Sequence, residues 1–279
     1  MTKTTTAPEG APTGPGRLAG RGAVVVGGGQ TPGPTVGNGK ATALAFAGEG
    51  ARVLVVDRDE DAAKDTVAEI EAAGGTAVAH RADVTAEDDC RALPGVALDA
   101  LGRIDVLHHN VGSVPHGNSD TLTLADWQRG LDVNLTGMWL VCKYVIPTMR
   151  ASGGGSVILI SSLAGGLALG DPIAYSTAKA AVNSLGRSLA VENAPHQVRV
   201  NVIAPGMIDT PIGVDEEARA AGLTRDEVAA AHTAMIPMGH QGTSRDIANA
   251  ALFLAGDESA FVTGVVLPVD GGSALSLAG

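Results

Sequence analysis

The chain has 279 residues, of which 45% are hydrophobic and only 3% aromatic, and its formal net charge is −11. This length is enough to bury a sizeable aliphatic core, and the 38 glycines suit tight turns between strands and helices. No stretch of the chain gathers lysine and arginine, so the composition argues against nucleic acid or an anionic membrane as a partner. No apolar run approaches the roughly 20 residues that a membrane-spanning helix needs.

Residues 1–20 differ from the rest of the chain because they repeat Thr, Pro and Gly and lack an apolar core. This composition excludes a secretory signal and predicts a disordered tail, which leaves residues 21–279 as a single domain. The only two cysteines, Cys90 and Cys142, do not have the spacing of metal ligands. We therefore expect no metal site, and we expect a soluble protein in the reducing cytoplasm.

Short apolar runs alternate with helical patterns along the remaining chain. Such runs are typical of strands that are buried on both faces of a parallel sheet. They occupy residues 23–26, 53–56, 106–107, 157–160, 198–203 and 265–269. The helical patterns cover residues 40–49, 59–73, 87–101, 125–149, 174–193 and 245–255. This alternation predicts an α/β fold of the doubly wound Rossmann type, with helices on both faces of a mostly parallel sheet.

One local conflict lies inside the helical pattern at 87–101, where Pro94 precedes Gly95. Proline removes a helix hydrogen bond and clashes with the preceding turn. We therefore expect a kink or a break at this position.

A glycine-rich turn follows the first predicted strand. Gly37-Asn38-Gly39 opens the next helical pattern, and Gly28 stands nine residues before Gly37. Glycines let the backbone turn sharply and approach a dinucleotide diphosphate, which rests on the helix N-terminus. A nucleoside-triphosphate loop would instead need glycine at Pro34 and a hydroxyl at Ala41. We therefore favour a dinucleotide site.

Asp57 ends the second predicted strand, eighteen residues past Gly39. An acidic side chain at this point can accept hydrogen bonds from both hydroxyls of an adenine ribose, and it would repel a 2′-phosphate. Arg58 follows immediately and could pair with such a phosphate. The expected cofactor is NAD, with NADP as the less favoured alternative.

Tyr175 and Lys179 stand four residues apart on a predicted helix, and Ser162 follows the apolar run at 157–160. Residues i and i+4 share a helix face, so the ammonium can lie beside the phenol and lower its pKa from about 10. The Ser162 hydroxyl can hydrogen-bond a substrate oxygen on which charge develops. The three residues together predict a site of general acid/base chemistry, although a Tyr-x-x-x-Lys pair alone would be a common accident.

In this order, the motifs resemble the short-chain dehydrogenase/reductase family in its single-domain branch. The match runs from about residue 22 to 273 and comprises the glycine turn at 27–39, Asp83-Val84, His109-Asn110-Val111-Gly112, Asn134, Ser162, Tyr175 with Lys179, Pro205-Gly206 and the segment 269–272. The resemblance implies a seven-stranded sheet and an NAD(P)-dependent oxidoreductase that acts on CH–OH groups. It also implies a catalytic tetrad of Asn134, Ser162, Tyr175 and Lys179.

The same resemblance implies where the cofactor lies. Asp83 and Val84 would bracket the adenine, Lys179 would bind the nicotinamide ribose, and Thr210 would bond the carboxamide. Asn134 would hold a water that relays protons through Lys179. The full expected cofactor set is Gly28, Gly37, Asn38, Gly39, Asp57, Arg58, Asp83, Val84, Asn110, Gly112, Tyr175, Lys179, Pro205, Gly206, Ile208 and Thr210.

Two positions depart from the family pattern. The glycine turn holds five extra residues within 29–36, which either alter a phosphate or adenosine contact or bulge outward without effect on binding. His109 replaces the first asparagine of the family's Asn-Asn-Ala-Gly. Because His108 and His109 are neighbours on a strand, they point to opposite faces, so we expect packed histidines and no metal pair.

The substrate is expected to be a hydrophobic secondary alcohol or ketone, possibly cyclic. Residues 210–235 have the composition of a helical flap over the pocket. Two alternatives stay open: a 3-oxoacyl-carrier-protein reductase that uses NADPH, and a noncatalytic protein that senses the cofactor. The resemblance further implies a homotetramer or homodimer. The expected pocket residues are Ser113, Val114, Ser162, Leu163, Ala164, Gly165, Leu167 and Met207.

Overall fold

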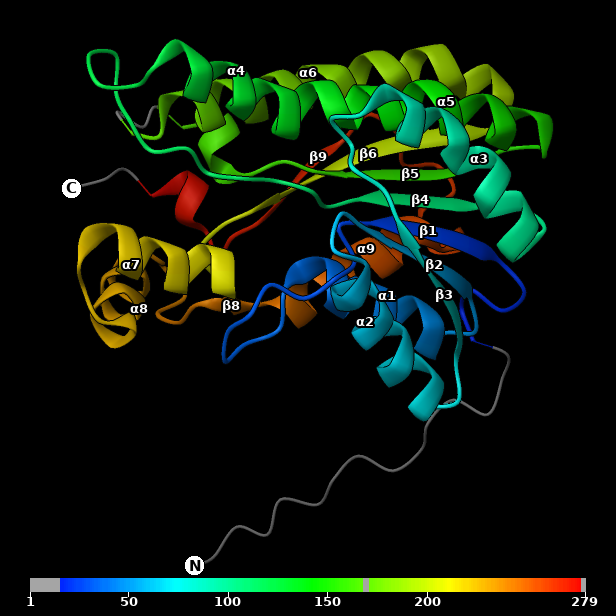
Figure 1. Ribbon diagram of the computed structural model, residues 1–279, viewed down its shortest axis with the longest axis horizontal. Helices are drawn as coiled ribbons and strands as arrows, with labels where there is room; N and C mark the ends of the chain where they lie inside the picture. Colours follow the sequence, from blue (N-terminus) through cyan, green and yellow to red (C-terminus); the bar gives the residue numbers. More distant parts are fainter. Residues whose placement is uncertain (1–15, 168–170, 277–279) are drawn as a thin grey trace, which may run out of the picture.

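The computed structural model describes residues 16–167 and 171–276 and contains one central sheet of seven parallel strands. The strand order is β3-β2-β1-β4-β5-β6-β9, which confirms the predicted doubly wound fold (Figure 1). The direction of strand addition reverses between β1 and β4. The strands are β1 (Gly22–Val26), β2 (Arg52–Asp57), β3 (Thr76–Arg81), β4 (Val106–His109), β5 (Gly155–Ile160), β6 (Val198–Pro205) and β9 (Val266–Val269).

Helices cover both faces of this sheet (Figure 1). One layer consists of α3 (Glu87–Leu101), α4 (Leu124–Leu131), α5 (Gly137–Ala151) and α6 (Ile173–Asn193). The opposite layer consists of α1 (Asn38–Gly48), α2 (Glu60–Ala72) and α9 (Ser244–Ala255). Beyond one end of the sheet lie two short helices and a second, two-stranded sheet: α7 (Glu216–Ala221), α8 (Arg225–Ala234), β7 (Ile208–Asp209) and β8 (Gly242–Thr243).

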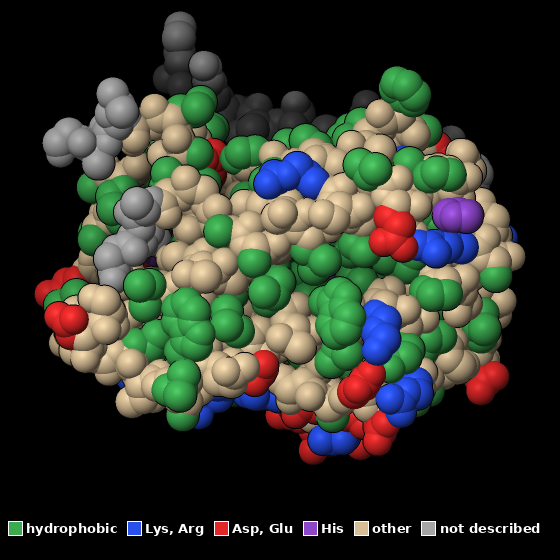
Figure 2. Space-filling view, turned by 90° about the horizontal axis from the view of Figure 1, so that it is seen from above, with side chains coloured by type: hydrophobic (Ala, Val, Ile, Leu, Met, Phe, Trp, Pro, Cys, Tyr) green, Lys and Arg blue, Asp and Glu red, His purple; other side chains and the backbone are tan. Residues whose placement is uncertain are grey.

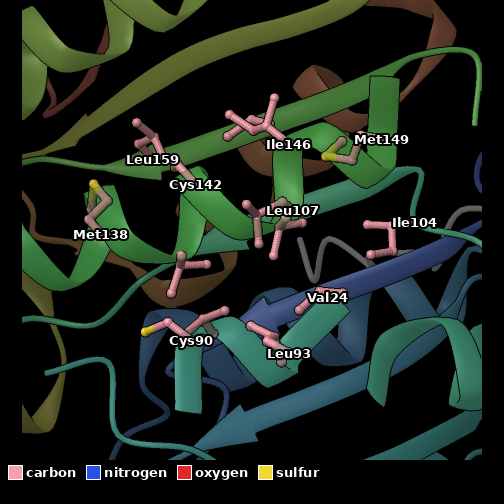
Figure 3. Close-up of a cluster of buried hydrophobic side chains, with 14 of the residues drawn as sticks. Val24, Cys90, Leu93, Ile104, Leu107, Met138, Cys142, Ile146, Met149 and Leu159 are labelled. Atoms are coloured by element: carbon pink, nitrogen blue, oxygen red, sulfur yellow. The ribbon is translucent and has the colours of Figure 1, made fainter. Parts of the chain in front are cut away.

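The core is aliphatic, as the composition predicts, and each helical layer packs its own cluster against the sheet. Figure 3 shows part of the cluster beneath α3 and α5, to which Leu93, Leu107 and Ile146 belong. Both cysteines lie in this cluster as free thiols. Burial raises the pKa of Cys90 to about 11 and that of Cys142 to about 12, so neither is a reactive thiolate near neutral pH.

Three local expectations need correction. Helix α3 continues through Pro94 without a break, since the buried side chains of Leu93 and Ala97 anchor the turns on both sides. Strand β3 was not among the apolar runs, because it is a sheet edge and alternates buried with exposed positions. The pattern at 125–149 is not one α-helix, because residues 132–136 form a π-helical turn between α4 and α5. Such wider turns occur often at functional sites.

The expected disordered tail, residues 1–20, lies mostly outside the described residues. Its last part, however, packs on the domain. Leu18 is fully buried, and its backbone N–H donates to the carbonyl of Glu49 at 2.9 Å. The folded domain therefore includes residues that the composition assigned to the tail.

The adjacent histidines of β4 lie in the core without polar partners. His108 packs edge-on against Phe46 of α1, with ring centroids 6.1 Å apart. All four ring nitrogens of His108 and His109 are buried and lack hydrogen-bond partners in the described chain. Burial lowers the pKa of each ring from 6.5 to about 3, so both are neutral near pH 7.

Substitution of His108 by leucine is predicted to make the protein less sensitive to acid. Between pH 6.5 and about 3 the unfolded chain binds a proton that the folded protein does not, so His108 lowers stability as the pH falls. From pH 7.5 to pH 5, the free energy of unfolding of His108→Leu should gain about 2 kcal/mol relative to wild type. Urea unfolding at both pH values measures this shift. If the free energy of unfolding of His108→Leu differed from that of wild type by the same amount at both pH values, the prediction would be wrong.

Candidate active site

Predicted site residues follow the carboxyl ends of β1, β2, β3, β4, β5 and β6, while Asn134 comes from a π-helical turn and Tyr175 and Lys179 come from α6. Open α/β sheets bind ligands at the carboxyl ends of their strands, where the strand order reverses. The flap helices α7 and α8 lie beyond the same end of the sheet (Figure 1). The topology thus brings together residues that are distant in sequence.

The start of α1 can hold an anionic group. A Cβ on Gly39 would lie 1.8 Å from the Gly27 carbonyl oxygen, so only glycine lets the helix start this close to β1. The first turn of α1 has no acidic residue and no side-chain cap. The Asn38 Oδ1 atom is buried and has no hydrogen-bond partner in the described part of the chain. Free N–H groups, the positive helix end and an unused polar group fit a dinucleotide diphosphate.

Asp57 faces the glycine turn. Its carboxylate accepts hydrogen bonds from the Gly29 N–H at 3.0 Å and from the Asp59 N–H at 3.2 Å. Its neighbour Arg58 lines a hollow together with Arg81 and Asp83. The Thr85 hydroxyl and backbone N–H donate to Asp83 and, with the nearby arginines, lower the pKa of its carboxyl. This part of the site can accept ribose hydroxyls and also carries positive charge. Val84, beside Asp83, is buried and packs against the start of α5.

Asn134 lies in the π-helical turn and is fully buried. Its amide donates to the carbonyls of Ser113 at 2.8 Å and Gly130 at 2.9 Å, and it accepts from the Ser113 N–H at 3.2 Å. These bonds fix the loop after β4. A Cβ on Gly112 would lie 3.1 Å from Asn134 Oδ1 and 3.5 Å from Lys179 Nζ, so this loop meets Lys179. Asn110 in the same loop donates to the Gly27 carbonyl at 3.4 Å, which links the loop to β1.

Lys179 is a buried cation, with 2% of its surface exposed. Its Nζ donates to the Ile160 carbonyl at 3.0 Å, and no described carboxylate forms an ion pair with it. Burial therefore lowers the pKa of Lys179 from 10.5 to about 8. The Ser161 hydroxyl donates to the Lys179 carbonyl at 2.9 Å and fixes the helix against β5. Sequence reasoning missed Ser161, although the Ser161-Ser162 pair at a strand end was a usable signal.

Tyr175 and Ser162 meet beside Lys179, but the expected effect of the lysine on the phenol is wrong for this structure. Burial raises the pKa of Tyr175, and a hydrogen bond with Ser162 only partly opposes that rise. The Lys179 Nζ lies over the aromatic ring, 5.5 Å from its centroid, and donates to Ile160. The ammonium therefore makes no hydrogen bond to the hydroxyl whose proton it was expected to loosen.

The chain after β6 leads into the flap. The Gly206 N–H donates to the Val269 carbonyl at 2.9 Å, and Ile208 pairs with Gly242 in the small sheet. The Thr210 hydroxyl accepts from the Gly213 N–H at 3.0 Å and caps the π-helical segment Pro211–Asp215. Thr210 keeps its hydroxyl proton free to donate. The expected flap is thus helical, with α7 and α8 as its two helices.

The expected pocket residues differ in their exposure. Leu163 and Ala164 are buried in the turn after β5, whereas Leu167 is 39% exposed. A Cβ on Gly165 would lie 2.7 Å from the Lys179 backbone, so Gly165 lets this turn pack on α6. Ser113, Val114 and Met207 are half-buried.

Within residues 16–167 and 171–276, no helix is long and apolar enough to cross a membrane. The same part of the chain contains no group of three His, Cys, Asp or Glu side chains placed to hold a metal ion.

Comparison with known proteins shows that the chain belongs to the short-chain dehydrogenase/reductase family. A family model described as enoyl-(acyl carrier protein) reductase matches residues 35–274. The chain is 40% identical over 256 residues to a 2,5-dichloro-2,5-cyclohexadiene-1,4-diol dehydrogenase of Sphingobium indicum, with 92% of this chain and 97% of the relative covered. The protein is therefore a dehydrogenase that acts on CH–OH groups and has an NAD(P)-binding Rossmann fold.

Solved structures agree with this assignment. A short-chain dehydrogenase/reductase from Burkholderia xenovorans has a TM-score of 0.89 at 41% identity, with 94% of this chain and 99% of the other covered. A 7α-hydroxysteroid dehydrogenase, in complex with NADH and 7-oxo-glycochenodeoxycholic acid, has a TM-score of 0.83 at 35% identity, with 92% and 95% covered.

Substitution of Lys179 by methionine is predicted to stabilise the cofactor-free protein at pH 7. Below pH 8 the lysine is charged in both the folded and the unfolded state, so the folded protein bears the cost of burying that charge. Above pH 8 the folded protein releases the proton first, and wild type gains stability relative to the variant. The advantage of Lys179→Met should be up to about 3 kcal/mol at pH 7 and should shrink toward pH 10. Guanidinium unfolding measures it, and a variant less stable than wild type at pH 7 would refute this reading.

Proposed function

We propose that this protein is an NAD-dependent dehydrogenase that interconverts a hydrophobic, cyclic secondary alcohol and its ketone. The observation that carries the proposal is the meeting of Ser162, Tyr175 and Lys179 at one end of the sheet, next to a helix start that fits a diphosphate. The noncatalytic alternative loses support, because both the tyrosine and the lysine are present and in contact.

In the proposed mechanism the Ser162 hydroxyl holds the substrate oxygen and Tyr175 exchanges a proton with it. The nicotinamide supplies the hydride acceptor, or the donor in the reverse direction. Lys179 lies over the Tyr175 ring and would bind the nicotinamide ribose, and Asn134 holds the loop at 112–113 that meets Lys179. Because partial burial raises the pKa of Tyr175, the phenol keeps its proton until a positive charge lies near its oxygen.

The preference for NAD rests on Asp57. Its carboxylate stands at the end of β2, bonded to Gly29, where it can accept ribose hydroxyls and repel a 2′-phosphate. Arg58 and Arg81 offer weaker support for NADP, since both are exposed. The NADH complex of the related hydroxysteroid dehydrogenase agrees with the choice.

A cyclic, hydrophobic substrate is supported by the lining of the site and by the relatives. Leu163, Ala164, Leu167 and Val114 offer no charge that would bind a carboxylate. One relative acts on a cyclohexadiene diol, and another was solved with an oxidised bile acid. The flap at 210–235 would cover the ring. An acidic carrier protein is a poor partner for a chain of net charge −11.

The assembly and the compartment belong to the same proposal. Figure 2 shows the face of the molecule above the α4 to α6 layer, where hydrophobic side chains gather between charged borders. Trp139 on α5 and Val191 on α6 are exposed, with 44% and 80% of their surfaces accessible. These surfaces support a homodimer or homotetramer. The free thiols of Cys90 and Cys142 support a reducing cytoplasm, and residues 21–279 would act as one domain.

The phenol can be tested directly. Tyr175→Phe should lower turnover of a cyclic alcohol by about 10²–10⁴-fold and leave the affinity for NADH nearly unchanged, because only the acid/base group is lost. Tyr144→Phe is the matched control, since Tyr144 is the other tyrosine of the chain and donates to Glu87 at the start of α3 instead of meeting Ser162. Cyclohexanols, cyclohexanediols, hydroxysteroids, linear alcohols and 3-oxoacyl thioesters are assayed by nicotinamide absorbance. Full turnover by Tyr175→Phe, or activity confined to thioesters with NADPH, would overturn the proposal.

The cofactor preference has its own test. Asp57→Ser should raise the ratio of kcat/KM for NADP over NAD by at least about tenfold, because the repulsion of the 2′-phosphate is removed. Arg58→Gln is the counterpart variant and should lower use of NADP with little change for NAD. A wild-type enzyme that already prefers NADP would contradict the assigned role of Asp57.

A further inference from the structure

The inserted residues of the glycine turn form an ordered loop, which we call the strap (residues 29–36). The Gln30 side chain closes it, since its Nε2 donates to the carbonyls of Thr31 at 2.6 Å and Thr35 at 3.1 Å. The Gln30 Oε1 accepts from the Gly37 N–H at 3.1 Å, at the start of α1. The strap therefore has a fixed shape and is anchored beside the proposed diphosphate site.

The strap reaches the flap. A Cβ on Gly33 would lie 2.8 Å from Pro211 Cγ and 3.2 Å from Asp215 Oδ2, so the strap backbone is in contact with the first turn of the flap. A turn that lacked the five extra residues would have less chain with which to span this distance. The loop after β1 extends toward the side where α7, α8 and β8 lie (Figure 1).

Arg225 joins these segments. Its guanidinium pairs with Asp209 in β7, with Asp215 at 3.1 Å in the flap, and with the Thr35 hydroxyl at 3.4 Å in the strap. About a quarter of the Arg225 side chain is exposed, at 27%, and that of Asp215 is 19% exposed. A planar group with five donors can hold three partners in fixed directions, which a lysine cannot. Asp209 immediately precedes Thr210, the residue expected to bond the nicotinamide carboxamide. The Arg225–Asp209 ion pair therefore holds the backbone next to the nicotinamide end of the proposed site.

We propose that Arg225 is a positioning residue that couples the strap to the flap and so slows release of the dinucleotide. The strap begins and ends at the diphosphate side, and the flap begins at the nicotinamide side. Their junction ties both borders of the cofactor site into one unit, which must loosen when the dinucleotide leaves. This inference rests on the proposed function, because it assumes that a dinucleotide occupies the site.

The test measures the dissociation rate of NADH by stopped-flow fluorescence after a chase with excess NAD. Arg225→Met should raise the rate by about threefold to tenfold, the range expected for loss of a partly buried ion pair. Deletion of residues 31–35 should raise it to a similar extent. The two changes combined should raise it no further than either alone, because both break the same junction. Arg225→Lys should lie between wild type and Arg225→Met.

A control separates this role from simple weakening of the flap. Glu227→Gln disturbs the cap of α8, where Glu227 accepts from the Thr224 N–H and hydroxyl, but it does not touch the strap. It should leave the rate near that of wild type. Thermal unfolding of every variant identifies misfolded proteins. If Arg225→Met or the deletion does not fold, Thr35→Val removes only the strap's bond and decides the question, with a faster release expected.

Each contrary result has a distinct meaning. Unchanged release in Arg225→Met, additive effects of the two changes, or an equal effect of Glu227→Gln would overturn the coupling and leave the proposed function intact. Failure of the wild-type protein to bind either NADH or NADPH would instead overturn the proposed function, and the inference with it.

Discussion

The site is organised around a positive charge that is buried without a carboxylate partner among residues 16–167 and 171–276. The Lys179 ammonium has one backbone acceptor, Ile160, and lies over the ring of Tyr175. Keeping such a charge out of water costs free energy, which the sheet and α6 must offset. Three contacts hold the lysine in this position. The Ser161 hydroxyl bonds the Lys179 carbonyl and joins α6 to β5, and Gly165 leaves room for the turn after β5 to pack on the Lys179 backbone. Asn134 bonds Ser113 and fixes the loop that lies against the Lys179 Nζ atom. A group held at such a cost is available for chemistry when a ligand arrives.

The second constraint is the close approach of α1 to β1. Gly39 stands against the Gly27 carbonyl with no room for a side chain, so the helix start points its free N–H groups into the site. The same approach leaves the five additional residues of the turn no place in the core. These residues form a loop outside the sheet. The Gln30 side chain closes this loop by hydrogen bonds, and its backbone at Gly33 contacts the flap. A local change in loop length thereby creates a contact between opposite borders of the site.

Much of this arrangement could be predicted from the chain alone, for physical reasons that particular residues illustrate. Runs such as residues 157–160 are apolar throughout because both faces of the central strands are covered, and periodicity therefore identifies them. Strand β3 escaped this criterion because one face of an edge strand meets solvent. The π-helical turn at Asn134 left no mark in the hydrophobic pattern, and Leu18 is a single buried residue in a polar segment. Thr35, the partner of Arg225 in the strap, is separated from it by 190 residues, a distance at which no spacing rule applies. The raised pKa of Tyr175 depends on partial burial, which the spacing of four residues between Tyr175 and Lys179 cannot supply.

The central claim is that Tyr175 is a half-buried phenol whose proton is loosened only when the dinucleotide completes the site. Ultraviolet titration of the phenols measures this most directly, and the Tyr144→Phe variant leaves Tyr175 as the single tyrosine. Without cofactor the midpoint should lie above the ordinary value of 10.0, and saturation with NAD should lower it by at least about one unit, because an oxidised nicotinamide adds positive charge. A midpoint already well below 10 in the free protein, or one that does not respond to NAD, would contradict the account.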